Sequence, residues 1–282
     1  MTGRDEETTP MTTASYRNFT STLAANYQRF FVPAVAAPAS VGLMRAAELQ
    51  PGERVLDVAC GTGLVARLAA EQVGPAGSVT GVDIASDMIE VAKAVPAAAG
   101  PPVEWLVGDA TALDLADGAF DVVLCQLGLM FMADRPVALG EMRRVLVDGG
   151  RLVVTTAGRI QGPFSAMEQA LVDHIGPELG GFVSSVFSMH DPAAVAALLG
   201  QAGFDAVSAT ETVTPLRLPP PAELLWEYLD VTPIAPMVAA ASGDARAALE
   251  RQVVEGCQPF VVDGATLVDQ PLVVASGVRR DG

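Results

Sequence analysis

The sequence predicts an α/β protein whose core is a doubly wound, mostly parallel sheet. Between residues 54 and 156, short apolar runs rich in β-branched residues alternate with helix-forming stretches. The first of these runs leads into a glycine turn, and several others are followed by polar residues. Such alternation is typical of a parallel sheet covered by helices on both faces. A chain of 282 residues can bury one large core with an added cap, so we expect a single domain over residues 14–282.

The strand expected at residues 54–59 leads into the most informative turn of the chain. Asp57 interrupts its apolar run, and a carboxylate in a central strand is costly unless it is hydrogen-bonded. We therefore expect Asp57 to lie where the strand meets a polar ligand or a loop. Gly61 and Gly63 follow, and glycine lets the backbone turn sharply and approach a ligand closely. With helix formers at residues 64–71, this stretch predicts a nucleotide-type site.

Six further strands complete an expected seven-stranded sheet, and helices are expected before it and near its end. The six strands are expected at residues 79–84, 103–107, 120–125, 151–156, 204–212 and 272–278. Residues 14–31 and 34–49 are predicted to form N-terminal helices that Pro33 separates. About forty residues between a run of three prolines and the last strand are too many for a simple connection, so we expect a helical cap over a ligand. Residues of about 50–160 would then bind a cofactor, and residues of about 160–265 would contribute a substrate cap.

Two residues are suited to cap the helices that follow them. Ser86 precedes a helix-forming stretch, and Asp191 is followed directly by Pro192, whereas Asp134 and Pro136 open a further helix that runs to about residue 147. Serine and aspartate side chains accept hydrogen bonds from the free N–H groups of the first helical turn, and proline is favoured inside that turn.

Composition and charge argue against several classes of protein. Thirty-three acidic residues against seventeen basic residues give a formal charge of −16, which repels nucleic acid and leaves no basic stripe to bind it. Three cysteines without CxxC spacing cannot close a disulfide framework and fit a reducing compartment. We expect no membrane span, because no apolar run reaches the roughly 20 residues that one needs. The polar, acidic residues 1–13 are unlike a signal peptide, so we expect a disordered leader on a cytoplasmic protein.

The carboxyl ends of the expected strands gather the residues suited to hold a ligand, because ligands of doubly wound sheets lie at these ends where the strand order reverses. The residues at these ends are Gly61, Gly63, Asp83, Asp109 and Gln126. Asp83 is suited to accept both ribose hydroxyls of a nucleoside, and Asp109 can accept the exocyclic amine of an adenine. Ile84 and Met88 are placed to pack on the adenine faces. Each acid alone is typical of a helix cap or a solvated loop, but their joint placement favours a nucleoside site.

Two cofactors are compatible with the glycine turn. Residues 61–66 match the G-x-G-x-x-G/A dinucleotide fingerprint, and Asp83 follows at the spacing that this fingerprint expects. Spacing alone therefore does not exclude NAD. Asp57, however, would place negative charge near a pyrophosphate, whereas the same charge suits the ammonium end of S-adenosylmethionine. Asp109 also favours the adenosyl sulfonium.

The same motifs resemble those of a known family, the class I S-adenosylmethionine-dependent methyltransferases, in the branch similar to the ubiquinone and menaquinone biosynthesis methyltransferases. The resemblance is specific over residues 52–156 and implies a Rossmann-like fold. The stretches that carry it are residues 55–63, residues 81–84 with Met88, residues 108–110, residues 120–126 and residues 141–152.

The resemblance also implies roles for particular residues in binding S-adenosylmethionine. It implies that Gly61 and Gly63 contact the methionine part and that Asp83 contacts the ribose. It assigns Asp109 and Ala110 to the adenine. It places Tyr27 over the cofactor carboxylate.

The expected function is methyl transfer from S-adenosylmethionine to a small, largely apolar acceptor at oxygen, carbon or nitrogen, in secondary or quinone metabolism. In-line transfer from a sulfonium needs mainly positioning, and a base is needed only for a poorly ionised acceptor. His174 and His190 are the candidate bases. Five aromatic residues can line an acceptor pocket or belong to the plain core: Phe164, Phe182, Phe187, Trp226 and Tyr228.

Two other functions stay open at the level of sequence. The protein can bind S-adenosylmethionine yet catalyse a cyclisation or rearrangement, because fold does not fix chemistry. It can also be a nicotinamide-dependent oxidoreductase. No His, Cys or carboxylate cluster has metal-ligand spacing, so we expect no required metal. The expected partner is a small-molecule acceptor, without nucleic acid, and a homo-oligomer is possible.

Overall fold

The computed structural model describes residues 20–96 and 99–281, and within them eight strands form one sheet. The predicted leader and the start of the first predicted helix lie outside the described residues. The strands are β1 (Arg54–Val58), β2 (Ser78–Asp83), β3 (Val103–Val107), β4 (Phe120–Gln126), β5 (Leu146–Ala157), β6 (Asp205–Leu218), β7 (Val261–Val262) and β8 (Ala265–Val278).

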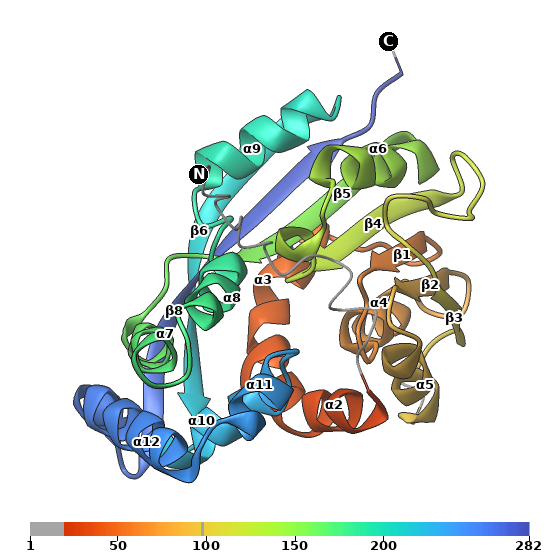
Figure 1. Cartoon of the computed structure of the whole chain (residues 1–282). Helices are drawn as coiled ribbons and strands as arrows, with labels where there is room; N and C mark the ends of the chain where they lie inside the picture. Colours follow the sequence, from red (N-terminus) through yellow and green to blue (C-terminus); the bar gives the residue numbers. More distant parts are fainter. Residues whose placement is uncertain (1–19, 97–98, 282) are drawn as a thin grey trace, which may run out of the picture.

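The sheet is doubly wound, with the order β3-β2-β1-β4-β5-β8-β6 and with β7 paired on β8. Strands β1 to β5 pair in parallel, whereas β8 runs antiparallel to both β5 and β6. The predicted fold class is therefore confirmed, but the predicted count of seven is one strand short. The missed strand is β7, whose two residues are too few to give a periodic signal. Strands β6 and β8 are also longer than predicted, since they extend together as a ribbon beneath the helical cap (Figure 1).

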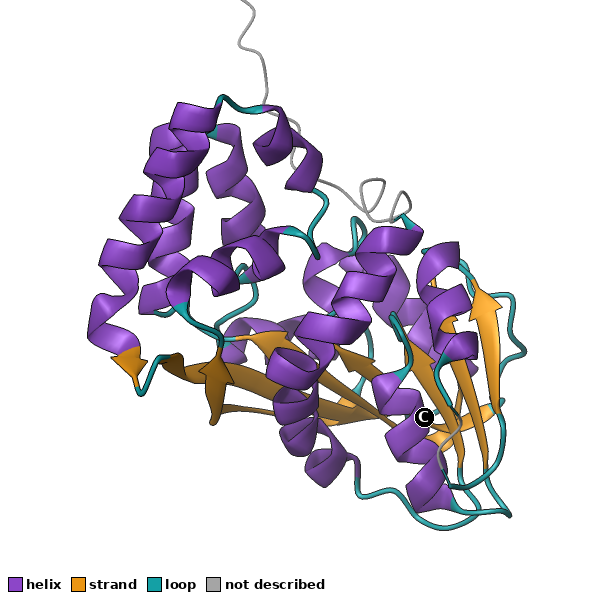
Figure 2. Ribbon diagram, turned by 90° about the horizontal axis from the view of Figure 1, so that it is seen from below, coloured by secondary structure: helices purple, strands orange, loops and turns teal. Residues whose placement is uncertain are grey.

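Helices cover the sheet and gather at one end of it (Figure 2). Those before the fifth strand are α2 (Ser21–Asn26), η1 (Tyr27–Ala36), α3 (Ala37–Ala47), α4 (Leu64–Val73), α5 (Ser86–Ala94), η2 (Leu129–Phe131) and α6 (Arg135–Val145). Those after it are α7 (Gly162–His174), α8 (Glu178–Val186), α9 (Pro192–Gln201), α10 (Pro221–Leu229), α11 (Ala235–Ala240), α12 (Gly243–Cys257) and η3 (Gln258–Phe260). Helices α10 to α12 occupy the predicted insertion before the last strand, and α12 packs on α7.

Strand β1 shows how the sequence builds two layers around the sheet. Val55 belongs to one apolar cluster with residues of α3 and α4, whereas Leu56 and Val58 belong to a second cluster with residues of α6 and α7. Because successive side chains of a strand point to opposite faces, Asp57 shares the α4 face with Val55. This alternation places the Asp57 carboxylate against the start of α4.

The N-terminal helices form one continuous segment, Ser21–Ala47, and not the two helices that were predicted. Pro33 lies within the π-helix η1. Proline has no N–H to donate, and the wider turn of a π-helix shifts the hydrogen bonds of its neighbours along the chain, so the helix passes through without a break. Among the described residues, this is the one helix long and apolar enough to cross a membrane by length and composition. Its residues Leu43 and Ala47 are buried in the sheet-facing cluster, as in a core helix.

One of the two predicted helix caps is confirmed, and the structure adds a cap at Asp134. Asp134 accepts a hydrogen bond from the N–H of Val137, and Asp191 accepts one from the N–H of Ala193. The Ser86 cap is wrong, because Ser86 is the first residue of α5 and the residue before it, Ala85, makes no side-chain cap hydrogen bond. Asp83 instead accepts a hydrogen bond from the N–H of Ala85, ahead of the helix.

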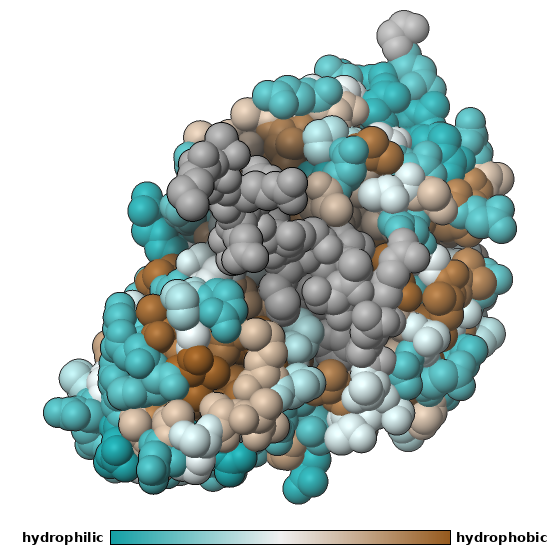
Figure 3. Space-filling view, viewed as in Figure 1, coloured by the Kyte–Doolittle hydropathy of each residue, from teal (hydrophilic) through white to brown (hydrophobic). Residues whose placement is uncertain are grey.

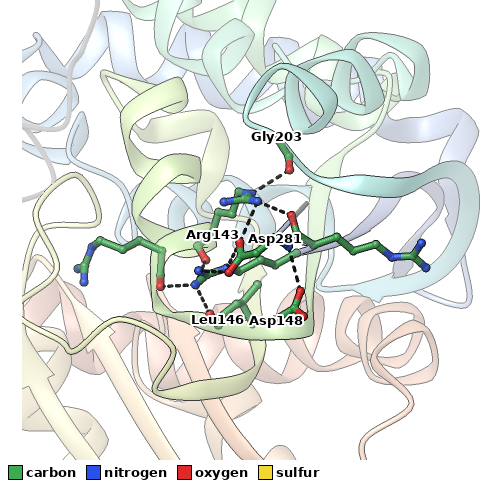
Figure 4. A network of polar contacts seen from close by, with 8 residues as sticks. Arg143, Leu146, Asp148, Gly203 and Asp281 are labelled. Carbon is green, nitrogen blue, oxygen red and sulfur yellow. Dashed lines mark hydrogen bonds and ion pairs between the residues drawn. The ribbon is translucent and has the colours of Figure 1, made fainter.

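The C-terminal segment is fastened to α6 by arginines (Figure 4). Arg279 donates to the carbonyl oxygens of Arg143, Arg144 and Leu146 at the end of that helix. Arg143 in turn donates to the carbonyl oxygen of Gly203, just before β6, at 2.8 Å. Because the last carbonyls of a helix lack intrahelical partners and carry partial negative charge, a guanidinium stabilises them.

We predict that Arg279→Ala lowers the free energy of unfolding by about 2–4 kcal/mol, because several part-buried carbonyls lose a charged donor. Chemical denaturation monitored by circular dichroism measures this difference. The matched control is Arg280→Ala, at an exposed neighbouring position, which should change stability by less than about 0.5 kcal/mol. Equal effects of the two substitutions would contradict the role assigned to Arg279.

Candidate active site

A pocket of about 880 Å³ opens at the carboxyl ends of β1, β2, β3 and β4, where the strand order reverses between β1 and β4. Eight of the residues predicted from sequence to bind cofactor line it: Tyr27, Gly61, Asp83, Ile84, Met88, Asp109, Ala110 and Gln126. The other two, Asp57 and Gly63, do not line it. We call this the first pocket.

Asp83 joins the glycine turn to the end of β2. Its Oδ2 accepts a hydrogen bond from the N–H of Gly61 at 2.7 Å, and its Oδ1 accepts one from the N–H of Ala85 at 2.9 Å. Burial raises the pKa of this carboxyl, and these backbone donors oppose the shift. A carboxylate oxygen can accept two hydrogen bonds, so Asp83 can hold the turn and still accept from hydroxyl groups in the pocket.

The opposite wall of the first pocket suits a planar base. Asp109 Oδ1 accepts hydrogen bonds from the N–H and the hydroxyl of Thr111, at 2.9 and 2.7 Å, which fix the loop after β3. Met88 packs in a small apolar cluster with Ala24 of α2 and Ala85. The N-terminal helix and α5 therefore meet at the apolar side of the pocket.

A smaller pocket of about 310 Å³ adjoins the first and contains Asp57. The side chain of Asp57 is 1% exposed, and its Oδ2 accepts a hydrogen bond from the N–H of Ala66, in the first turn of α4, at 2.9 Å. Burial raises the pKa of Asp57 to about 8, against the opposing hydrogen bond from Ala66. Burial therefore favours the protonated form of this carboxyl.

Two further polar atoms in the smaller pocket have no hydrogen-bond partner among the described residues. They are Thr62 Oγ1 and Gln126 Oε1, both buried. Gln126 uses its Nε2 to donate to the carbonyl oxygen of Ala36 at 2.9 Å, which ties β4 to the N-terminal helix. Together with Asp57, these atoms offer acceptors for an ammonium group and a donor for a carboxylate. The smaller pocket therefore fits the amino-acid end of a ligand whose nucleoside occupies the first pocket.

Gly63 does not line these pockets, and the packing around it requires a glycine. Its φ is +83°, and a Cβ placed on it would lie 2.2 Å from the ring of Trp105. Gly61 also has positive φ, +54°, but its neighbour on the Cβ side is the ring of Tyr27 at an ordinary 3.6 Å. The backbone conformation therefore favours glycine at both positions, and close packing adds a second requirement at Gly63 alone.

Tyr27 lies where the pockets meet, since it lines the first pocket, the smaller pocket and a further apolar pocket. Its ring stacks on Phe31 with the centroids 4.8 Å apart. Burial, with the charges of Asp83 and Asp57 adding to it, raises the pKa of the Tyr27 hydroxyl well above its ordinary value. The side chain is therefore a neutral hydrogen-bond donor.

The further apolar pocket, which we call the second pocket, has a volume of about 810 Å³ and shares Tyr27, Leu127 and Phe131 with the first. Of the aromatic residues predicted to line an acceptor pocket, four do so: Phe164, Phe182, Phe187 and Tyr228. Trp226 does not, because its Nε1 donates to Glu250 at 2.6 Å elsewhere in the cap. In the view of Figure 3, apolar side chains gather in the region of α8 and α11.

The two histidines lie outside these pockets. His174 Nε2 is 2.6 Å from Gln252 Oε1 of α12, and His190 Nδ1 is 2.9 Å from the carbonyl oxygen of Phe187. Neither residue lines the first, smaller or second pocket. Over residues 20–96 and 99–281, no group of three or more His, Cys, Asp or Glu side chains could hold a metal ion.

Sequence reasoning missed several residues that line the pockets. Thr62 lay unnoticed between the two glycines, and Gln270 and Leu216 gave no signal within their long strands. Leu127 has a φ of +52° where the chain leaves β4, a feature that the structure shows and the sequence does not. The fold and these pockets define a nucleoside-binding, doubly wound α/β protein with an apolar second site.

Comparison with known proteins makes this class specific. A family model for a methyltransferase domain matches residues 55–150. Demethylmenaquinone methyltransferase of Thermus thermophilus is 37% identical over 164 residues, which cover 54% of this chain and 74% of that protein. Phosphoethanolamine N-methyltransferase 2 of Haemonchus contortus, solved with S-adenosyl-L-methionine, has a similar fold with a TM-score of 0.57 and 18% identity, over 93% of this chain and 58% of that chain. The cyclase SpnF has a TM-score of 0.51 and 19% identity, over 86% and 81%.

The chain belongs to the class I S-adenosylmethionine-dependent methyltransferases, and it is related to the branch of ubiquinone and menaquinone biosynthesis. It is an enzyme of this family with S-adenosylmethionine as its cofactor. The glycine turn was compatible with both NAD and S-adenosylmethionine, and the comparisons decide in favour of S-adenosylmethionine.

We predict that binding of S-adenosylhomocysteine at about pH 6.5 releases about one proton. Asp57 is then mostly protonated, and the ammonium group of the ligand, which carries its positive charge at this pH, favours the carboxylate. Affinity therefore rises as the pH approaches about 8 from below. Calorimetry in two buffers of different ionisation enthalpy measures the released proton. Asp57→Asn should remove the release, and an unchanged release in that variant would contradict the assignment.

We predict that Asp83→Ala weakens binding of S-adenosylhomocysteine by more than the roughly 1–3 kcal/mol of one unsatisfied polar group, because two hydroxyl partners are lost. The ligand-free variant should also melt at a lower temperature, since the N–H groups of Gly61 and Ala85 lose their acceptor. Calorimetric titration and thermal melting measure the two effects. The control, Asp114→Ala, removes an exposed acid outside the pocket. Unchanged affinity in Asp83→Ala would refute its role.

Proposed function

We propose that the protein transfers the methyl group of S-adenosylmethionine to a small, largely apolar aromatic acceptor in the second pocket. The observation that carries this proposal is the common wall of Tyr27, Leu127 and Phe131 between the first and second pockets. Because methyl transfer needs donor and acceptor in line and in contact, two adjoining sites of this kind suit it. The cap at about residues 160–265 then contributes the acceptor site.

The residues proposed to hold the cofactor follow from the two adjoining cavities. Asp83 accepts the ribose hydroxyls, and Asp109 and Ala110 face the adenine beside Ile84 and Met88. In the smaller pocket, Asp57, Thr62 and Gln126 hold the amino-acid end, while Gly61 and Tyr27 close against it. When bound, S-adenosylmethionine supplies a methyl group already activated by its positive sulfur.

The chemistry of the second pocket favours an acceptor with an oxygen anion or an electron-rich ring carbon. None of the described residues that line it carries a charged side chain. Transfer from a sulfonium to an oxygen anion, or to a ring carbon made electron-rich by such an anion, removes charge, which a low-dielectric pocket favours. Transfer to a neutral amine would instead leave a buried cation without a counter-ion, which is costly. We therefore favour oxygen or carbon over nitrogen.

The proposal assigns no base to either histidine, since neither lines the second pocket. Tyr228 is the nearest titratable alternative, but burial and the charge of Glu168 raise its pKa well above the ordinary value. A neutral Tyr228 hydroxyl can orient an acceptor through a hydrogen bond. An acceptor that ionises in solution needs this orientation but no general base.

The name of the Thermus thermophilus relative supports a quinone-type acceptor, because that protein methylates demethylmenaquinone by its name. A reduced naphthoquinone is aromatic, largely apolar and ionisable at oxygen, and it meets the requirements of the second pocket. Location in the cytoplasm and self-association stay predictions from the sequence.

A cyclisation or rearrangement is the alternative proposal. The cyclase SpnF has the same fold as this chain, and fold does not fix chemistry. The two proposals differ in whether the cofactor is consumed. Formation of S-adenosylhomocysteine in proportion to product therefore separates them.

The experiment is turnover of S-adenosylmethionine with reduced naphthoquinones, phenols and aromatic amines, followed by mass spectrometry. We expect a gain of one methyl group on a quinol or phenol, with one S-adenosylhomocysteine formed per product. Methylation of amines alone would contradict the charge argument. Product formation without S-adenosylhomocysteine would support the cyclisation proposal.

A matched pair of variants tests the second pocket as the acceptor site. Val231→Phe enlarges a buried side chain that lines it, and Val262→Phe makes the same change at an exposed position outside it. We expect Val231→Phe to lower turnover about tenfold or more by occupying the pocket, with affinity for S-adenosylhomocysteine unchanged. Val262→Phe should leave both unchanged. Equal turnover by the two variants would place the acceptor elsewhere.

A further inference from the structure

Gln270 is a buried polar residue in the apolar wall of the second pocket. It lies on β8, paired with Thr214 of β6, and its side chain is 5% exposed. Alternate residues along this strand, Val268 and Leu272, are buried apolar side chains on the same face. The row that β8 presents beneath the cap is thus interrupted by one amide.

The orientation of the Gln270 amide is set by its donor side. Nε2 donates to the carbonyl oxygen of Pro271 at 2.8 Å and lies 3.5 Å from the carbonyl oxygen of Arg159. An amide turned the other way would face these carbonyls with its own oxygen, so the nitrogen belongs where it is. The oxygen Oε1 is therefore left as an acceptor.

Oε1 of Gln270 is buried and has no hydrogen-bond partner among the described residues. The nearby hydroxyl of Thr232, which also lines the second pocket, already donates to the carbonyl oxygen of Leu229 at 2.8 Å. A buried acceptor without a donor is costly, and such atoms are few in folded proteins. An isosteric apolar side chain would fill the same space without this cost.

We infer that Gln270 recognises the acceptor by accepting a hydrogen bond from a protonated aromatic hydroxyl group, other than an oxygen that reacts as the anion. This inference rests on the proposed function, since it takes the second pocket as the acceptor site. Gln270 is not part of the wall shared with the first pocket. It contributes specificity for hydroxylated rings over the corresponding hydrocarbons, in a pocket whose other walls are largely apolar.

The test compares binding of 1-naphthol and naphthalene to the protein saturated with S-adenosylhomocysteine, measured by the fluorescence of the two probes. A purely apolar pocket would prefer naphthalene, because burying an unpaired hydroxyl is costly. We expect the wild-type protein to bind 1-naphthol about tenfold or more tightly than naphthalene. In Gln270→Met, which has nearly the same shape, we expect this preference to vanish or reverse. A preference unchanged in Gln270→Met would overturn the inference.

A control variant and the wild-type result distinguish failure of the Gln270 inference from failure of the proposed acceptor site. Gln258→Met removes an amide whose Nε2 donates to the carbonyl oxygen of Val254 outside the pocket, and it should retain the full preference. If wild-type protein binds both probes equally, the inference fails while the aromatic acceptor site stands. If it binds neither, the proposed acceptor site fails and the inference fails with it. The wild-type comparison needs no variant to fold.

Discussion

The site depends on two buried carboxylates at the ends of neighbouring parallel strands. Asp57 accepts from the N–H of Ala66 at the start of α4, and Asp83 accepts from the N–H groups of Gly61 and Ala85. Together they fix the glycine turn between β1 and α4 and join it to the end of β2. Burial raises the pKa of both groups and so favours their protonated forms, whereas a cationic ligand beside them favours the carboxylates.

The N-terminal helix connects the first pocket to the second. Its π-helical segment η1 carries Tyr27 into the common wall of the pockets, and Gln126 of β4 fastens the helix through the carbonyl oxygen of Ala36. The same segment packs near α10 of the cap. A ligand in the first pocket therefore meets side chains that also line the second.

The sequence predicted the fold and most of the first pocket because both follow from local rules. Strands and glycine turns have short-range signals, and polar residues just after strands mark the binding edge, as Asp83 and Asp109 did. The sequence predicted Gly63 only as a ligand contact. Motif spacing could not show that Trp105 leaves no room for a Cβ at this position, since that contact forms only in the folded chain. Pro33 was expected to separate two helices. It lies instead within a π-helical turn, which residue helix propensities do not predict. The second pocket assembles side chains from distant cap helices and strands, so Gln270 could be found only in three dimensions.

The most direct test of this account is a crystal structure of the protein with S-adenosylhomocysteine bound. We expect the ribose hydroxyls at Asp83, the adenine between Ile84 and Asp109, and the ammonium group in the smaller pocket at Asp57. The sulfur should then face the wall of Tyr27, Leu127 and Phe131 that borders the second pocket. A bound ligand whose sulfur points away from that wall would contradict the account, because methyl donor and acceptor would then not meet.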